Sequence, residues 1–302
     1  MGKVKRKVSI IIPNYNGKEH LKRLLASIAE QTFDDYEVII IDDFSQDRSV
    51  LDYVKTFIKG HENMRLVENT ENMGFVKTCN KGFGLADGDY VCILTNDTEV
   101  KGNFVEKNVE IMNADSSIGV LSCIIVDQHG NNWFSGGSFK GGFPVNLKDD
   151  FEGIRTVDFA AGTAPFYRRE VLNKVGLLNE DFFMYHEDID FCLRVRNKTD
   201  YKVCTFSQKL VRHYPNISEP GAGWAKLRRI LYYGHRNHIL ILRKYCPRYL
   251  PKVLLSHSRE IANFLAVSIL KPSPKMFLIA LSVARGVLAG LVKRQSKQLQ
   301  AS

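Results

Sequence analysis

The chain has 302 residues, of which 44% are hydrophobic and 25% charged, a composition typical of a folded protein with one large or two smaller domains. Its charge is uneven, because residues 224–302 contain 15 basic residues and one acid, Glu260, whereas residues 1–223 contain 27 basic and 32 acidic residues. The six cysteines form no CxxC pair, which favours reduced cytosolic thiols over a disulfide framework. No run of 18 apolar residues occurs, since Arg285 interrupts the longest candidate, so we expect no spanning helix.

The first hundred residues predict strands that alternate with helices. Continuous apolar runs indicate buried strands within residues 8–16, 36–45, 64–69 and 89–97. Helical spacing of apolar residues indicates helices within 18–31, 48–60 and 74–86. Strands that lack internal polar alternation predict a parallel sheet covered by helices on both faces.

The rest of the chain is more irregular. Residues 127–158 are rich in Gly, Asn and Asp and indicate loops or a small hairpin. Residues 157–176 predict a strand, a tight turn and a helix, and residues 201–216 predict two strands joined by a connection. From residue 224 the pattern is helical to the C-terminus, with a break at 271–275.

Polar residues follow three of the predicted strands. They are Pro13-Asn14-Tyr15-Asn16, Asp42-Asp43 and Asn96-Asp97. Asn-Asp is ordinary turn chemistry, but ligands of parallel sheets bind beyond the carboxyl ends of the strands. Three polar clusters at such ends favour a binding site over three unrelated turns.

Six segments in order resemble the successive motifs of family 2 glycosyltransferases with the GT-A fold. They are "SIIIPNYNG", "VIIIDDFSQDRS", "NMGFVKTCNKG", "LTNDTEV", "FFMYHEDIDFCLR" and "VRHYPNIS", and the resemblance covers roughly residues 7–245. It is nearest to the rhamnosyltransferase-like enzymes of bacterial polysaccharide and O-antigen assembly. The resemblance implies an α/β fold, with a Rossmann-like, mixed but mostly parallel sheet flanked by helices and a C-terminal helical extension.

The resemblance also implies a division of the chain. Residues 1–223 form the catalytic domain, with a nucleotide-binding half at about 1–100 and an acceptor-binding half at about 101–223. The implied reaction is an inverting, metal-dependent transfer from a nucleotide sugar. We favour dTDP-rhamnose as the donor, and UDP-galactose, UDP-glucose or another UDP-sugar stays open.

The nucleotide-binding residues are assigned from the matching motifs. Tyr15 can stack on a pyrimidine, and Asp43 can accept the ring N–H. The other candidates are Pro13, Asn16, Asn72, Gly74, Asn80 and Asn96. The alternative role for Tyr15 is that of an aromatic side chain packed within its loop. The alternative for the other residues is a structural role in turns or helix caps.

The metal site departs from the family's two-acid motif. Thr95-Asn96-Asp97 offers one carboxylate, Asp97, and His213 matches a histidine that completes the metal shell in relatives. A diphosphate supplies further oxygens, so the two residues can suffice for Mn²⁺ or Mg²⁺. A histidine at a strand end is the alternative for His213.

The acids of "YHEDID" carry the predicted chemistry. Asp188 matches the family's base, and Glu187 orients it, raises its pKa or binds the acceptor. Asp190 is expected to cap the helix, and helix-start electrostatics is the alternative for all three. Gly162, Thr163 and Trp133 are candidates for contacts with the sugar or the acceptor, with a core role as the alternative for Trp133. Arg168 or Arg169 is a candidate for phosphate, with solvated surface charge as the alternative.

Residues 224–302 read as a basic amphipathic region that associates with membrane. A polar stripe of Lys275, Ser282, Arg285 and Lys293 suits a helix in an anionic membrane surface. The alternative is a helical pair that packs on the catalytic domain or forms a homodimer. We therefore expect a peripheral protein on the inner, cytoplasmic face of the cell membrane, with a glycan or polyprenyl-diphosphate-linked acceptor. Nothing in the chain resembles a nucleic-acid-reading element.

Overall fold

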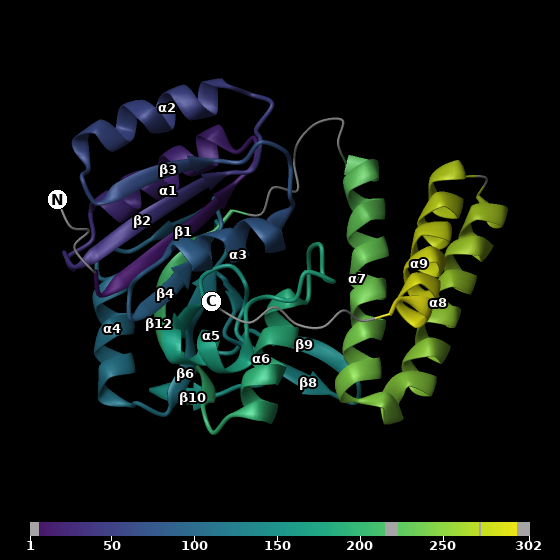
Figure 1. Ribbon diagram of the computed structural model, residues 1–302. Helices are drawn as coiled ribbons and strands as arrows, with labels where there is room; N and C mark the ends of the chain where they lie inside the picture. Colours follow the sequence, from purple (N-terminus) through teal and green to yellow (C-terminus); the bar gives the residue numbers. More distant parts are fainter. Residues whose placement is uncertain (1–5, 215–222, 272, 295–302) are drawn as a thin grey trace.

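The computed structural model describes residues 6–214, 223–271 and 273–294 (Figure 1). The strands are β1 (Val8–Asn14), β2 (Tyr36–Asp42), β3 (Met64–Glu68), β4 (Tyr90–Ile93), β5 (Thr98–Val100), β6 (Ile118–Val126), β7 (Asn132–Phe134), β8 (Gly136–Lys140), β9 (Phe143–Leu147), β10 (Ile154–Thr156), β11 (Phe166–Arg168) and β12 (Lys202–His213). The helices are α1 (Lys18–Ala29), α2 (Ser49–Phe57), η1 (Ile58–Gly60), α3 (Phe75–Leu85), α4 (Phe104–Ala114), α5 (Arg169–Val175), α6 (Glu187–Lys198), α7 (Gly223–Tyr245), η2 (Pro247–Tyr249), α8 (Leu250–Leu270) and α9 (Pro274–Val292). Residues 215–218, the second half of the "VRHYPNIS" motif, lie outside the described residues.

One mixed sheet organises the first 214 residues. Its order is β10-β12-β6-β11-β4-β1-β2-β3, with β5 beside β12 and β7 beside β6. The pairs β1–β2, β1–β4, β2–β3 and β6–β12 are parallel, and β11 lies antiparallel between β4 and β6. The predicted mixed, mostly parallel sheet with flanking helices is confirmed.

The sequence explains why the central strands are buried. Every residue of β1 and of β2 is buried, because each run of isoleucines and valines meets a neighbour on both edges and side chains on both faces. In α1, the buried residues Leu21, Leu24, Leu25 and Ile28 form one stripe that packs inward. The carboxyl ends of β1, β2 and β4 thereby reach one edge of the sheet.

Two irregular regions refine the sequence prediction. Residues 127–158 contain the predicted hairpin, formed by β8 and β9, together with the short strands β7 and β10. Residues 202–213 were expected to be two strands, but they form the single strand β12 with register shifts between Phe206 and Val211. The bulged strand keeps its pairing with β6 and brings its end back to β5.

The three C-terminal helices α7, α8 and α9 stand side by side at one end of the molecule (Figure 1). Helix α9 packs closely on α7 at Gly286. The backbones approach so closely there that a Cβ added to Gly286 would lie 2.4 Å from the Tyr232 carbonyl oxygen. Just after α9, Lys293 forms a 3.1 Å ion pair with Asp181 in the segment between α5 and α6. The predicted polar stripe therefore turns in part toward the protein, since Ser282 is buried against α7.

Two helices in the described residues are long and apolar enough to cross a bilayer by length and composition. They comprise Pro247–Leu270, which includes η2, and Pro274–Val292. Helix α9 carries two charges, Lys275 and Arg285, and is still long and apolar enough to cross a bilayer, so the expectation that no helix spans the membrane stays a prediction. Several large apolar side chains of α8 and α9 are exposed, namely Leu255, Val267, Ile269, Leu270, Phe277, Leu281, Leu288 and Val292.

Candidate functional site

The polar residues at the strand ends meet, as the sequence predicts. The side-chain amide of Asn14 donates to Asp42 Oδ1 at 3.1 Å, and its oxygen accepts a 2.8 Å hydrogen bond from Asn96 Nδ2. The ends of β1, β2 and β4 are thus joined by side chains. The other candidate residues lie around this hydrogen-bond network at the ends of the strands.

Asp43 holds the loop that precedes α3. Its Oδ1 accepts from the backbone N–H of Met73 and from Asn69 Nδ2, and its Oδ2 accepts from the Gly74 N–H at 2.9 Å. Gly74 has a φ of 83°, and a Cβ there would lie 2.6 Å from the Phe183 ring. Glycine is therefore required for the conformation and for the close approach of this loop.

The neighbouring candidates for nucleotide binding differ in solvent exposure and in hydrogen bonding. Tyr15 is exposed, with 46% of its surface accessible, and Asn72 is exposed as well. Asn16 has a φ of 54°, and its side-chain oxygen accepts from the Gln46 and Asp47 N–H groups. Pro13 lies within β1.

Asn80 is buried between α3 and the loop before α6. Its side-chain amide donates to the Leu178 carbonyl at 2.9 Å, and its oxygen accepts from the Leu178 N–H at 3.0 Å. The amide also donates to Glu180 Oε1 at 3.2 Å. Asn80 thus joins α3 to the segment that leads into Glu187.

Asp97 and His213 lie together because β12 pairs antiparallel with β5. His213 is opposite Thr98, which places His213 Nε2 3.2 Å from Asp97 Oδ2. The Trp133 ring lies 4.4 Å from the His213 ring, between centroids. Among the described residues, Asp97 Oδ1 and His213 Nδ1 are buried without a hydrogen-bond partner.

The chemistry of this pair fits a divalent cation. Burial raises the pKa of Asp97, but the hydrogen bond and charge of His213, together with Thr95, outweigh burial and lower the pKa below its usual value. An ionised carboxylate with an unpartnered oxygen beside an imidazole is a suitable donor set for Mn²⁺ or Mg²⁺.

Asp188 connects to the same turn through a short backbone path. The Gly162 N–H donates to Asp188 Oδ2 at 2.8 Å, and the Thr163 carbonyl accepts from the Thr95 N–H at 3.1 Å. Gly162 and Thr163 therefore lie between the base candidate and the turn that carries Asp97. Residues distant in sequence are thereby joined into one site.

The two adjacent acids have different surroundings. Asp188 accepts backbone N–H groups at both oxygens, from Gly162 and from Ile189. Glu187 Oε2 is buried without a partner among the described residues. Burial, and then the neighbouring Asp188 carboxylate, raise the pKa of Glu187 to about 8. Burial also raises the pKa of Asp188.

The loop before these acids is strained and is held by α7. Tyr185 and His186 both have a φ of 66°, a backbone conformation that residues other than glycine rarely adopt. The buried Asn237 Nδ2 donates to the carbonyls of Met184 at 2.8 Å and of Tyr185 at 2.7 Å. The sequence analysis missed Asn237, because nothing in a helical pattern indicates which distant loop it contacts.

Three sequence-based roles need correction. Asp190 does not cap α6, since its buried carboxylate pairs with Arg194 at 2.8 Å and with Lys244 of α7 at 2.9 Å. Arg168 donates to the backbone carbonyls of Ile118 and Met112, and Arg169 donates to that of Gly88. These arginines hold backbone carbonyls, so their partners are within the fold.

Solved structures with this fold bind nucleotide sugars. The structure of the mannosyltransferase PcManGT from Pyrobaculum calidifontis, in complex with GDP-Man and Mn²⁺, aligns with a TM-score of 0.60 at 18% identity over 96% of this chain and 88% of that chain. S. aureus TarS residues 1–349 in complex with UDP-GlcNAc aligns with a TM-score of 0.56 at 19% identity, over 78% of this chain and 66% of that chain. These likenesses establish a GT-A-like fold.

Sequence relatives point to the same class of protein. The amylovoran biosynthesis glycosyltransferase AmsB of Erwinia amylovora is 26% identical over 212 residues, which cover 68% of this chain and 69% of AmsB. Matches to two further curated relatives cover 58% and 41% of their lengths. The family model for Glycosyl transferase family 2 matches residues 9–176, more than half of the chain. The chain therefore belongs to glycosyl transferase family 2 and is a glycosyltransferase.

Proposed function

We propose that the protein transfers a sugar, with inversion, from a nucleotide-sugar donor to a hydroxyl of a lipid-linked or polysaccharide acceptor in cell-surface glycan synthesis. The observation that carries the proposal is the connected site formed by Asp97, His213 and Asp188. The relatives include a glycosyltransferase of amylovoran biosynthesis, which supports glycan assembly as the process. Among donors, dTDP-rhamnose is favoured by the forms of "NDTEV" and "HEDIDFCLR", and a UDP-hexose is the alternative.

The donor would lie along the edge formed by β1, β2 and β4. Exposed Tyr15 offers a face for the base, and Asp43, with one hydrogen bond at Oδ2, keeps room to accept a ring N–H. Asn16, Asn72, Gly74 and Asn96 would line the ribose and phosphate side, with Pro13 and Asn80 supporting them.

Asp97 and His213 would hold a divalent cation against the donor diphosphate. Each residue keeps a buried atom without a hydrogen-bond partner among the described residues, Asp97 Oδ1 and His213 Nδ1, and each of these atoms can coordinate a cation. When bound, Mn²⁺ or Mg²⁺ supplies positive charge that stabilises a leaving diphosphate. Trp133 beside His213 would contact the sugar or the acceptor.

Asp188 would act as the general base. The acceptor oxygen forms a bond to the anomeric carbon, its proton passes to the Asp188 carboxylate, and the bond to the nucleoside diphosphate breaks with its electron pair. The Gly162 N–H fixes Asp188 Oδ2, and Thr163 lies beside it. Glu187, whose pKa is about 8, would be protonated at pH 7 and able to donate to the acceptor or to Asp188.

Donor turnover tests this proposal directly. Hydrolysis and transfer would be measured for dTDP-rhamnose and UDP-hexoses, with and without Mn²⁺, in the wild type and in Asp97→Ala. We expect metal-dependent turnover of one donor that is lost in the variant. Binding of a donor without any turnover would favour the second candidate, a catalytically weakened subunit that binds nucleotide sugar or glycan, which the single carboxylate in Thr95-Asn96-Asp97 supports.

The C-terminal helices suit association with the inner face of the cell membrane. Exposed Phe277, Leu281 and Leu288 on α9, in a region of net positive charge, support contact with anionic lipid. A homodimer would cover the same side chains. Sedimentation with phosphatidylglycerol vesicles, together with the mass in solution, distinguishes the two arrangements.

A further inference from the structure

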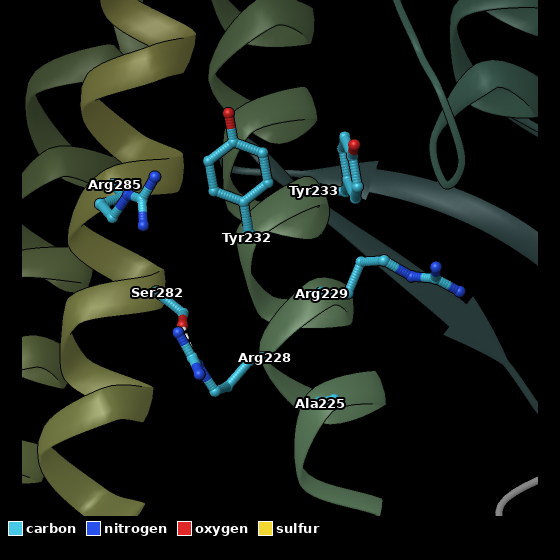
Figure 2. A pocket seen from close by; sticks show the side chains of 7 residues that line it. All are labelled: Ala225, Arg228, Arg229, Tyr232, Tyr233, Ser282 and Arg285. Carbon is cyan, nitrogen blue, oxygen red and sulfur yellow. Dashed lines mark hydrogen bonds between the residues drawn. The ribbon is translucent and has the colours of Figure 1, made fainter. Parts of the chain in front are cut away.

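A pocket of about 330 Å³ lies between α7 and α9, outside the site described above (Figure 2). Its lining residues are Ala225, Arg228, Arg229, Tyr232, Tyr233, Ser282 and Arg285. Figure 2 shows Ser282 and Arg285 on α9 and the other five on α7, with the Arg228 side chain extending to Ser282. Three arginines and two tyrosines therefore line this small space, although the Arg229 and Tyr233 side chains extend away from α9 (Figure 2).

The positive charge of this pocket is uncompensated in the part of the chain that the structure describes. Arg228 Nε donates to Ser282 Oγ at 3.2 Å, and Ser282 in turn donates to the Leu278 carbonyl. No ion pair joins Arg228, Arg229 or Arg285 to a carboxylate among residues 6–214, 223–271 and 273–294. By contrast, Lys244 at the other end of α7 pairs with Asp190, and Lys293 after α9 pairs with Asp181.

Guanidinium groups without a counter-ion select a phosphate by geometry. An arginine presents parallel N–H donors that match two oxygens of a phosphate group, and tyrosine hydroxyls add further donors. An anion in the pocket would also offset the positive charge of the arginines that line it. The pocket chemistry therefore favours a phosphate or diphosphate group.

Apolar surface adjoins the charged residues. Leu281 precedes Ser282, Leu288 lies three residues after Arg285, and both leucines are exposed, as is Phe277 one turn earlier on α9. A ligand that carries a charged head and an apolar chain would contact both kinds of surface. This pairing favours a diphosphate ester of a lipid over a free anion.

The pocket also contacts the loop that leads to the catalytic acids. Tyr233 stacks on Phe183 with 5.1 Å between ring centroids, and Phe183 lies against Gly74 of the donor side. Burial raises the pKa of Tyr185, two residues before Glu187, and the positive charge of Arg229 partly opposes that rise. A ligand head in the pocket would thus lie beside the segment that positions the base.

We infer that the pocket between α7 and α9 binds the diphosphate head of the lipid-linked acceptor, with Arg228 and Arg285 as its main ligands. The inference rests on the proposed function, because it names the anchor for that function's acceptor. The lipid chain would run over the exposed face of α9, and the glycan would extend toward Asp188.

Binding of farnesyl diphosphate and of inorganic pyrophosphate tests the inference. Both would be titrated by calorimetry without divalent cation and in an Asp97→Ala background, so that the donor site cannot hold the diphosphate. We expect farnesyl diphosphate to bind more tightly than pyrophosphate, and the affinity to fall about ten- to a hundredfold in Arg228→Gln/Arg285→Gln. The control is Arg259→Gln, which removes one charge from an exposed position of α8 and should leave the affinity unchanged.

Further measurements keep the result interpretable. Arg285→Gln alone removes a guanidinium that makes no hydrogen bond among the described residues, so it should fold normally and still weaken binding. Equal affinity in wild type and the double variant, or an equal loss in Arg259→Gln, would overturn the inference. So would pocket-dependent binding to phosphatidylglycerol vesicles without binding of farnesyl diphosphate, since that marks a phospholipid site. Nucleotide binding with Mn²⁺, measured separately in the Asp97 background and in wild type, reports on the proposed function alone.

Discussion

The Asn237 side chain of α7 donates a 2.7 Å hydrogen bond to the carbonyl oxygen of Tyr185, at the first of two consecutive residues with a φ of 66°. A C-terminal helix thereby fixes the backbone immediately before Glu187 and Asp188. Replacing Asn237 with Ala would leave the carbonyls of Met184 and Tyr185 without these donors. We expect a loss of about 1–3 kcal/mol of unfolding free energy, measured by urea denaturation.

The same variant separates stability from positioning. Transfer assayed well below the melting temperature should fall in Asn237→Ala, because the loop can relax from its strained conformation. Unchanged transfer in the folded variant would mean that Asn237 stabilises the fold without positioning the acids.

Glu187→Gln and Asp188→Asn should differ strongly at pH 7. Glu187 has a pKa of about 8, so a neutral amide reproduces its predominant state and most transfer should remain. Asp188→Asn removes the proposed base and should reduce kcat by about 10²- to 10⁴-fold, while donor binding is retained. A larger loss in Glu187→Gln than in Asp188→Asn would assign the base to Glu187.

The stability of the fold should depend on the protonation of Glu187. Because burial raises its folded pKa from 4.5 to about 8, its favourable contribution is complete below pH 4.5 and is lost as the pH rises to 8. Glu187→Gln should therefore gain thermal stability relative to wild type between pH 5 and pH 8.5. His186 has the opposite sign, since burial lowers its pKa to about 3, but it is present in both proteins and cancels in the difference.

Asp97→Asn tests the metal donor set with little change in volume. The amide keeps one oxygen but removes the charge, so Mn²⁺ affinity in the presence of nucleoside diphosphate should fall by at least about tenfold. Calorimetric titration of Mn²⁺ measures this directly. Equal affinity in the two proteins would exclude Asp97 as a ligand.

Gly286 of α9 and Gly234 of α7 give a matched test of how α9 packs on α7. Gly286→Ala would place a Cβ 2.4 Å from the Tyr232 carbonyl oxygen, whereas a Cβ at Gly234 meets nothing within 4 Å. We expect Gly286→Ala to destabilise the protein by about 1–3 kcal/mol and Gly234→Ala to stabilise it by up to about 1 kcal/mol. Equal effects on the melting temperature would mean that α9 does not pack on α7 in this way.

Local patterns predicted much of the fold and part of the site. The apolar runs of β1 and β2 and the stripe of α1 follow from burial on two faces or on one, so their types could be inferred without a structure. The meeting of Asn14, Asp42 and Asn96 followed from the rule for carboxyl ends of parallel strands.

Long-range partners were beyond the sequence. Nothing local indicated that Asp190 would pair with Lys244, or that Asn237 would hold the loop at Tyr185, because each contact joins segments about fifty residues apart. The sequence predicts two strands with a connection where the structure has the single strand β12, whose register against β6 shifts between Phe206 and Val211. The same bulge gives His213 the register that brings it to Asp97.

The buried Asp190 of α6 pairs with Arg194 of the same helix and with Lys244 of α7, so the C-terminal helices α7 to α9 contribute a charge to the interior of the preceding part of the fold. A truncated protein that stops before α7 would leave Asp190 with one of its two cationic partners and would expose the apolar residues beneath the helix. Exchanging the C-terminal helices between related enzymes would therefore require that the new helices supply residues equivalent to Lys244 and Asn237. Chimaeras designed as though the tail were an independent module should lose activity even when they remain soluble.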